Sequence, residues 1–178
     1  MLAIRMPSPV KLICGVIYSK EEVYQRVKEI LQRKFGEIDL ESEKIDFYFT
    51  DYYDKEMGAP LYRKFISFRR LKDATILVGI KLFCIKVERK LSKDGHRQIN
   101  IDPGYLNDAK FVLATTKDYA HRIYLGKGIY AEVTLRYGNG IFYDFPTTYP
   151  DYCSPQYKKV LLAVRKIYHE QAKDLSRK

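Results

Sequence analysis

Side chains that bind anions and transfer protons gather in one stretch of the chain, TTKDYAHRIYLGKGIYAEVTLRY, which covers residues 115–137. Lys117 and Arg122 are suited to hold an anion through charge-assisted hydrogen bonds. His121 and Glu132 are side chains of the kinds that transfer protons in enzymes. We therefore expect a site for a phosphate-bearing ligand, such as a nucleotide or an RNA end. His121 and Glu132 are its catalytic candidates for hydrolysis or transfer.

The glycines of Gly126-Lys127-Gly128 separate two alternating runs, which predicts a β-hairpin. If the turn is centred on the middle residue, Arg122 lies opposite Glu132 and Tyr124 opposite Tyr130. Alternation then gives the ribbon one polar-aromatic face and one mainly apolar face. The polar face is the predicted wall of the site.

Three further residues of this region are assigned to ligand binding, namely Asp118, Tyr124 and Thr134, and Arg63 is added from an earlier strand. His121 falls in the register of the apolar face, where a boundary histidine with a structural role is the alternative. The pair of Arg122 and Glu132 also has a structural alternative. An exposed cross-strand ion pair contributes only about 0.2–1 kcal/mol and is common in sheets.

Carboxylates elsewhere in the chain suggest a hard cation. Asp51 and Glu56 lie in the stretch TDYYDKEMG, and Asp102 ends a predicted strand and begins the Asp-Pro-Gly of residues 102–104, which predicts a turn. Mg²⁺ prefers oxygen ligands and keeps several waters, so these three are the predicted metal ligands if the fold brings their loops together. The alternative is an acidic loop that balances nearby basic strands.

Several chemistries are excluded by missing motifs. The chain has no G-x-x-x-x-G-K-[ST] loop, so a P-loop nucleotide-binding protein is excluded. Its three histidines form neither an H-E-x-x-H motif nor a pair of H-x-T motifs. Cys14, Cys84 and Cys153 are far apart and include no C-x-x-C, which disfavours disulfides and cysteine zinc sites and fits a reducing cytoplasm.

The composition is that of a basic globular protein. The 178 residues include 32 Lys and Arg against 22 Asp and Glu, a net charge of +10, which favours anionic partners such as RNA. A solvated charged surface is the alternative reading. No window approaches the roughly 20 apolar residues of a spanning helix, so we expect a cytoplasmic protein without a membrane segment. The oligomeric state is left open.

The elements that must position these residues follow the order β-α-β-β-α-β. This order predicts an α+β fold with a ferredoxin-like core, extended by the antiparallel hairpin and a C-terminal helix that Ser154 and Pro155 begin. Residues 1–178 are read as one domain, with an N-terminal arm at 1–9 and a basic tail at 170–178. The predicted strands are residues 10–18, 45–53, 63–70, 97–102 and 110–115, and the predicted helices follow caps at Ser19 and Asp73 and end at Gly36 and Gly95.

Two other functions remain open at this point. A nonenzymatic RNA-binding module would use the basic stripe of the C-terminal helix and exposed tyrosines. A structural or partner-binding protein would need no ligand site at all.

Long stretches of the chain resemble a known family. They are YYDKEMG, RQINIDPGYL, KFVLATTKDYAHRIYL and GIYAEVTL, in this order. The sequence is similar, from Pro9 to about Tyr168, to a prokaryotic family catalogued as domain of unknown function 4416. The resemblance implies a stand-alone cytoplasmic protein of about this size, and it implies no activity, cofactor or catalytic residue.

Overall fold

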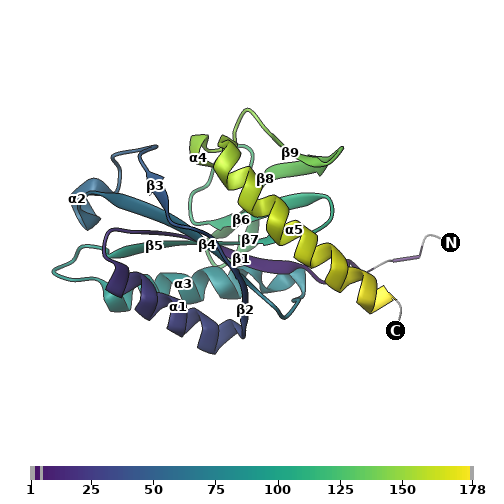
Figure 1. The fold of residues 1–178 in the computed structure, drawn as a ribbon, viewed down its shortest axis with the longest axis horizontal. Coiled ribbons are helices and arrows are strands. Elements are labelled where there is room, and N and C mark those ends of the chain that lie inside the picture. Colours follow the sequence, from purple (N-terminus) through teal and green to yellow (C-terminus); the bar gives the residue numbers. More distant parts are fainter. Residues whose placement is uncertain (1–2, 5, 177–178) are drawn as a thin grey trace.

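The computed structural model describes residues 3–4 and 6–176, and these fold as an α+β protein around one nine-stranded antiparallel sheet (Figure 1). The main path of the sheet has the order β2-β4-β1-β5-β6-β8-β7, while β3 pairs with β4 and β9 pairs with β8. The strands are β1 (Lys11–Tyr18), β2 (Ile38–Glu41), β3 (Ile45–Phe47), β4 (Leu61–Phe68), β5 (Ile99–Leu106), β6 (Lys110–Thr115), β7 (Ile123–Gly126), β8 (Ile129–Gly138) and β9 (Ile141–Asp144). The helices are α1 (Glu21–Phe35), α2 (Asp54–Met57), the 3-10 turn η1 (Ala74–Ile76), α3 (Leu77–Leu91), α4 (Pro150–Cys153) and α5 (Pro155–Ser176).

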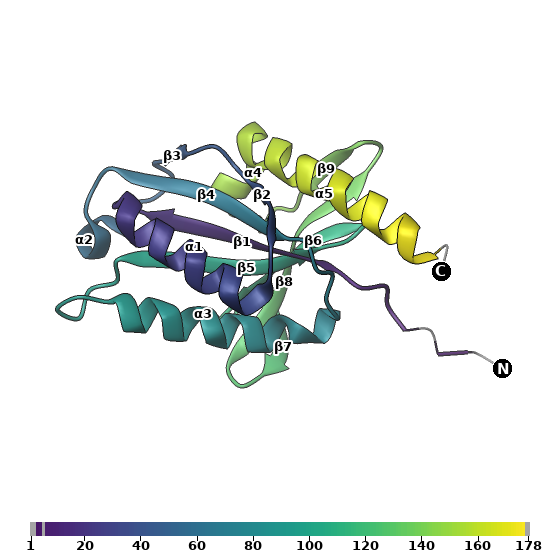
Figure 2. The same ribbon diagram turned by 60° about the horizontal axis from the view of Figure 1, so that its bottom comes forward.

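Helices cover both faces of the sheet. Figures 1 and 2 show α1 and α3 on one face and the long helix α5 crossing the other. Every residue of β1 is buried, because this central strand has helices on both sides. Cys14 and Val16 pack in the core under α1 and α3, while Ile13 packs in the core under α5. The alternation of a strand thus divides β1 between two hydrophobic cores.

Strands β5 and β6 pair along only part of their length. The paired positions are Gly104 with Leu113, Tyr105 with Val112 and Leu106 with Phe111. Gly104 allows this close approach, because a Cβ at that position would overlap the carbonyl oxygen of Val112. Beyond this short ladder β5 continues beside β1, and β6 continues beside β8. The sheet therefore opens between the start of β5 and the end of β6.

Several predicted elements are confirmed with small shifts in their ends. Gly36 ends α1 with φ of 101°, a backbone conformation that favours glycine. Asp73 accepts a hydrogen bond from the backbone of Thr75 at the start of η1, and α3 follows. Ser154 accepts from the backbone of Tyr157 at 3.3 Å, so it caps α5 as predicted.

Other local predictions are wrong. Ser19 does not cap α1, because its hydroxyl donates to the carbonyl of Met57 at 2.7 Å. The predicted turn at residues 102–104 lies inside strand β5, where pairing with β1 keeps the Asp-Pro-Gly extended. Helix α3 ends at Leu91 rather than at Gly95, which lies in the following turn with φ of 79°.

The strand predicted over residues 45–53 is only the short β3, and a loop and α2 follow it. This loop carries aromatic side chains that contact the sheet and α5: Phe47 packs against Tyr53, and Phe49 packs against Tyr157. Side-chain packing thus replaces strand pairing after Phe47.

The two ends of the chain differ from each other. Residues 3–4 and 6–9 of the predicted arm form no regular element, and residues 1, 2 and 5 lie outside the described part. Residues 170–176 of the predicted tail continue helix α5, where Gln171 accepts a hydrogen bond from Lys11 at 2.7 Å. Residues 177–178 also lie outside the described part. No helix in the described ranges has the length and apolar character needed to cross a membrane.

Candidate functional site

A cavity of about 420 Å³ lies where the sheet opens between β5 and β6. Its walls come from the loop after β3, from the sheet, from α3 and from the segment around α4. The lining includes the charged side chains Arg63, Lys81, Glu88, Arg97, Asp102, Lys117, Glu132 and Asp151, the polar Asn100, and the aromatic Phe49, Tyr52, Tyr53, Tyr149 and Tyr152. A concave site of this size, in which polar groups converge beside aromatic side chains, suits a small ligand.

The floor of the cavity is organised around Arg63 on β4. Its side chain is 2% exposed, and its guanidinium bonds to Asp102 Oδ2 at 2.9 Å and to Asp151 Oδ2 at 3.0 Å. Its Nε donates to the hydroxyl of Tyr157 at 3.2 Å. Two carboxylates and a phenol oxygen therefore satisfy the three nitrogens of one buried guanidinium.

Gly15 on β1 makes room for this guanidinium. A Cβ at Gly15 would lie 2.7 Å from Nη1 of Arg63 and 3.1 Å from the hydroxyl of Tyr152. The glycine is therefore required by the close approach of two large side chains rather than by its own backbone conformation.

Two polar groups of the lining have no hydrogen-bond partner among residues 3–4 and 6–176. They are the hydroxyl of Tyr152, a residue 2% exposed, and Nδ2 of Asn100, a residue 5% exposed. Leaving a buried polar group unpaired costs about 1–3 kcal/mol, so such groups are rare. A third, the hydroxyl of Tyr18, lies in the core under α1 and α3, away from the cavity. The cavity thus presents unused hydrogen-bonding capacity to whatever enters it.

Two side chains of α3 occupy the gap in the sheet. Glu88 Oε1 accepts from the backbone N–H of Ile101 at 2.5 Å, and Lys81 Nζ donates to the carbonyl of Ile101 at 3.1 Å. These are the backbone groups of β5 that β6 would otherwise pair. Because side chains take that role, the strands can separate without leaving the Ile101 backbone unsatisfied.

Burial and neighbouring charges shift the pKa values of the floor carboxylates in different directions. Burial tends to raise the pKa of Asp102, but Arg63 and Lys81 hold it below its usual value. Burial raises the pKa of Asp151, and Arg63 offsets this only in part. Burial likewise raises the pKa of Glu88 against the influence of Lys81. Pairs of carboxyls whose pKa values are pushed apart are suited to acid and base roles.

The predicted cross-strand pair is present, and it is buried. Arg122 Nε donates to Glu132 Oε2 at 2.8 Å, and the two side chains are 2% and 3% exposed. The same guanidinium donates to the carbonyl of Lys117 at 3.0 Å and to the hydroxyl of Tyr149 at 2.7 Å. Thr134 donates to Glu132 Oε1 at 3.3 Å. Glu132 lines the cavity and Arg122 does not. Arg122 instead supports Glu132 from outside the lining and holds the loop after β6 through the carbonyl of Lys117.

The predicted sorting of the hairpin faces is correct for Tyr124 opposite Tyr130 and wrong for His121. His121 lies in a turn before β7, so strand alternation does not apply to it. Its Nε2 is 3.2 Å from Glu132 Oε2, on the polar side. Burial follows neither face throughout, since Thr134 is buried and Ile123 is 67% exposed, whereas Tyr124 is 60% exposed and Leu135 is buried.

The mouth of the cavity is aromatic and basic. Tyr52 and Tyr53 pack edge to face with their ring centroids 5.0 Å apart. Lys117 Nζ lies 5.0 Å from the centroid of the Tyr52 ring, and Arg97 lies 5.4 Å from that of Tyr53. Arg97 also pairs with Glu56. Cations over aromatic rings make a rim that suits a flat or anionic group.

The remaining predicted residues are placed apart from this cavity. Asp118 and Tyr124 are exposed and are absent from the described lining of the cavity, and Glu56 reaches it only through Arg97. Asp51 lines a separate acidic hollow near β3 with Asp54. The proposed metal ligands therefore do not come together, and the described ranges contain no group of three His, Cys, Asp or Glu side chains placed to hold an ion.

Sequence reasoning missed much of the floor: Asn100, Asp151, Tyr152, Tyr157, Lys81 and Glu88. A signal existed for the last two, because Lys81 and Glu88 lie among the buried apolar positions of α3. A charged side chain on the buried stripe of a helix indicates a buried partner.

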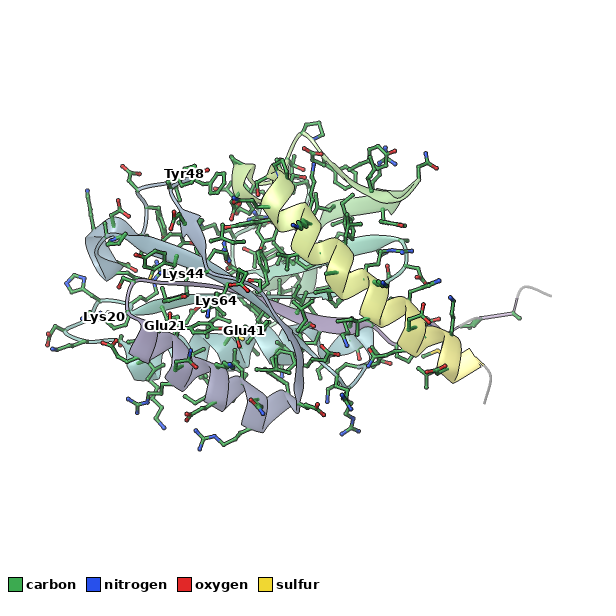
Figure 3. All side chains as sticks on the ribbon, viewed as in Figure 1. Lys20, Glu21, Glu41, Lys44, Tyr48 and Lys64 are labelled. Atoms are coloured by element: carbon green, nitrogen blue, oxygen red, sulfur yellow. The ribbon has the colours of Figure 1, made fainter. Side chains whose placement is uncertain are left out.

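A second charged cluster lies outside the cavity, beside α1 (Figure 3). Lys64 Nζ is 3.1 Å from Glu41 and 3.7 Å from Glu21, and it lies over the ring of Tyr24. Glu41 also accepts from the hydroxyl of Tyr24 at 2.9 Å. These contacts satisfy one another, so this cluster is a structural network.

The fold and the cavity together define an α+β protein with a polar and aromatic pocket at an opening in its sheet. Within that class, the chain belongs to the family described as Domain of unknown function (DUF4416), whose model matches residues 8–168. Comparisons with curated proteins and with solved structures found no match.

Proposed function

We propose that this protein binds a phosphate-bearing ligand, a nucleotide or an RNA end, in the cavity between β5 and β6. The observation that carries the proposal is the pair of buried, unpartnered polar groups on Tyr152 and Asn100, which line one cavity. A ligand that bonds to them recovers a cost that the unliganded fold bears.

The rest of the lining supports a ligand with a ring and an anionic group. Tyr52 and Tyr53 offer aromatic surface on which a base can stack. Lys117 is exposed at the rim and has no carboxylate partner in the described part of the chain, so its charge is free for a phosphate. Arg63 and Arg122, in contrast, are already paired with carboxylates.

The proposal extends to hydrolysis or transfer at the same site. Asp151 and Asp102 share Arg63, and their pKa values are shifted in opposite directions, which suits an acid and a base. His121 with Glu132 is the other proton-transfer pair, at the cavity wall. No metal ligand set is included in the proposal, because Asp51, Glu56 and Asp102 do not converge.

Binding is tested by calorimetry with the four nucleoside monophosphates, with and without Mg²⁺, on wild type, Tyr152→Phe and Lys159→Ala. We expect wild type and Lys159→Ala to bind alike, because Lys159 is exposed on α5 away from the lining. Tyr152→Phe should bind about tenfold more weakly, the equivalent of about 1.4 kcal/mol. If no nucleotide binds to wild type, or if Tyr152→Phe binds as wild type does, the proposal is overturned.

We also propose that the core of the sheet is ferredoxin-like and that the chain forms one domain. The order β2-β4-β1-β5, with α1 and α3 on one face, supports this fold.

The alternative function is a nonenzymatic RNA-binding module, which is favoured by the net charge of +10. That alternative predicts salt-dependent RNA binding that Tyr152→Phe leaves unchanged.

A further inference from the structure

The charges of the cavity are separated by depth. Four carboxylates line the cavity: those of Glu88, Glu132 and Asp151 are buried, and the Asp102 side chain is 25% exposed. Arg63 and Lys81 are the cations among these deep lining residues, and Arg122 supports Glu132 from behind. The buried arginines are already paired with carboxylates, which disfavours a phosphate there and favours N–H donors.

The rim has the opposite character. Lys117 is exposed there and, within the described part of the chain, faces the ring of Tyr52 rather than a carboxylate. Arg97 lies over Tyr53 on the same side, makes one ion pair, with Glu56, and donates to Asn100 Oδ1 at 3.4 Å, so it reaches from the rim to the floor. An anionic group therefore meets a cation without a carboxylate partner among the described residues, Lys117, at the mouth and arginines that are already paired with carboxylates further in.

The floor offers a donor beside an acceptor. Asn100 and Asp102 are two residues apart on β5, so their side chains leave the same face of the strand. Asn100 Nδ2 makes no hydrogen bond of normal geometry within the described residues, although the Asn100 side chain is close enough to Asp102 to help lower the pKa of that carboxylate. Asp102 Oδ1 lies 4.0 Å from Lys81 Nζ, beyond hydrogen-bonding distance. An N–H donor next to an acceptor is the pattern that the edge of a nucleobase presents.

We propose that a nucleotide enters this cavity base first, with its base edge at Asn100 and Asp102 and its phosphate at Lys117. The inference rests on the proposed nucleotide-binding function and adds the orientation of the nucleotide in the cavity. With the phosphate at the mouth, a chain attached to that phosphate can continue into solvent. The ligand class is therefore a nucleoside monophosphate group, either free or as the terminal residue of a single-stranded RNA.

Two variants separate the two ends of the ligand. Asn100→Leu removes the floor donor, and Lys117→Ala removes the rim charge. Each is measured by calorimetry with a nucleoside, its monophosphate and inorganic phosphate, with Lys159→Ala as the matched loss of an exposed lysine. We expect Asn100→Leu to weaken nucleoside and nucleotide by about the same factor, near tenfold. Lys117→Ala should weaken the nucleotide and inorganic phosphate but not the nucleoside, and Lys159→Ala should weaken none of the three.

The outcomes distinguish the two proposals. If no nucleotide binds to wild type, the function itself fails. If nucleotides bind but Lys117→Ala weakens the nucleoside as much as the nucleotide, the direction fails while the function stands. A loss of phosphate binding in Asn100→Leu would likewise reverse the direction.

Competition by RNA identifies the source of the ligand. A linear single-stranded oligonucleotide should displace a bound monophosphate, and a circular RNA of the same sequence should not, because it has no terminal residue. If neither RNA competes, the ligand is a free nucleotide. Equal competition by the circle would overturn end-on entry.

Discussion

Arg63 and Asp151 form a buried ion pair of 3.0 Å between residues 88 positions apart in the sequence. The pair joins the sheet strand β4 to the short helix α4, and Asp102 on β5 completes it from the other side. Because α4 contributes Tyr152 to the cavity, this ion pair fixes a wall of the proposed site as well as the packing of α4 on the sheet.

Replacing Arg63 tests how much this cluster contributes to the stability of the fold. Arg63→Met leaves Asp102 and Asp151 without their cation, and breaking such a buried pair costs about 3–5 kcal/mol. Arg63→Lys keeps the charge but lacks the planar fork that serves two carboxylates, so we expect a smaller loss. Urea unfolding at neutral pH measures both, and equal stability of the two variants would contradict the assignment.

The two tyrosines near Arg63 should respond differently to loss of their hydroxyls. Tyr157→Phe removes the acceptor of Arg63 Nε and should destabilise the protein by about 1–3 kcal/mol. Tyr152→Phe removes a hydroxyl that has no partner in the described chain, so stability should stay the same or rise. Thermal and urea unfolding of the unliganded proteins check this. A loss in Tyr152→Phe as large as that in Tyr157→Phe would show that its hydroxyl is paired.

The sequence predicts the elements of this fold better than it predicts their uses. Hydrophobic periodicity was enough to predict α3 and β6, and the glycines of residues 126–128 predicted the hairpin. The turn predicted from the Asp-Pro-Gly of residues 102–104 is wrong, because turn propensity is a local property, whereas pairing with the distant strand β1 keeps these residues extended. The same reason explains Ser19, whose hydroxyl bonds to a distant carbonyl.

Of the site, the sequence could predict the local contacts and not those between distant segments. Arg122 and Glu132 lie opposite each other in one hairpin, so a local rule of pairing finds them. The cluster of Arg63, Asp102 and Asp151 joins three distant segments, and nothing in the spacing of a single sequence marks their meeting. The opening of the sheet is equally invisible, since it depends on where β5 stops pairing with β6.

Gly15 should not tolerate alanine. The new Cβ would lie 2.7 Å from Nη1 of the buried, doubly paired Arg63, which cannot move without breaking its contacts. We expect Gly15→Ala to destabilise by about 1–3 kcal/mol through overpacking. Gly79 in α3 is the control, because a Cβ there meets nothing within 4 Å and alanine favours helices. Gly79→Ala should be neutral or stabilising by up to about 1 kcal/mol. Circular dichroism during thermal unfolding compares the two, and a tolerated Gly15→Ala would mean that Arg63 is free to shift.

The stability contributed by Asp102 should depend on acid pH. Arg63 and Lys81 hold its pKa below the ordinary 3.8 despite burial. A carboxylate with a depressed folded-state pKa stabilises the fold above its unfolded pKa, and this contribution is lost as the pH falls through the folded value. Asp102→Asn should therefore destabilise by about 1–3 kcal/mol at neutral pH, with a deficit that shrinks below about pH 4. Urea unfolding across this range measures the deficit, and a constant difference would exclude ionised Asp102 as its source.

Glu88 should show the opposite pH dependence, because burial raises its pKa above the ordinary 4.5 even with Lys81 nearby. For a raised folded-state pKa, the stabilising contribution is complete below the unfolded pKa and is lost as the pH rises through the folded value. Wild type loses this contribution to its free energy of unfolding as the pH rises, and Glu88→Gln has no such group to lose it. The stability of the glutamine variant relative to wild type should therefore increase from about pH 4 to about pH 7. Glutamine keeps an oxygen that accepts from the backbone of Ile101, whereas Glu88→Ala leaves that N–H unpaired in the gap of the sheet.

The alanine variant should therefore be less stable than wild type at both pH values, by about 1–3 kcal/mol. Hydrogen exchange adds a local measurement, because the amide of Ile101 should lose protection in Glu88→Ala and keep it in Glu88→Gln. If that amide exchanges alike in both variants, Glu88 does not satisfy β5 at the opening. The separation of β5 from β6, on which the cavity depends, would then need another support.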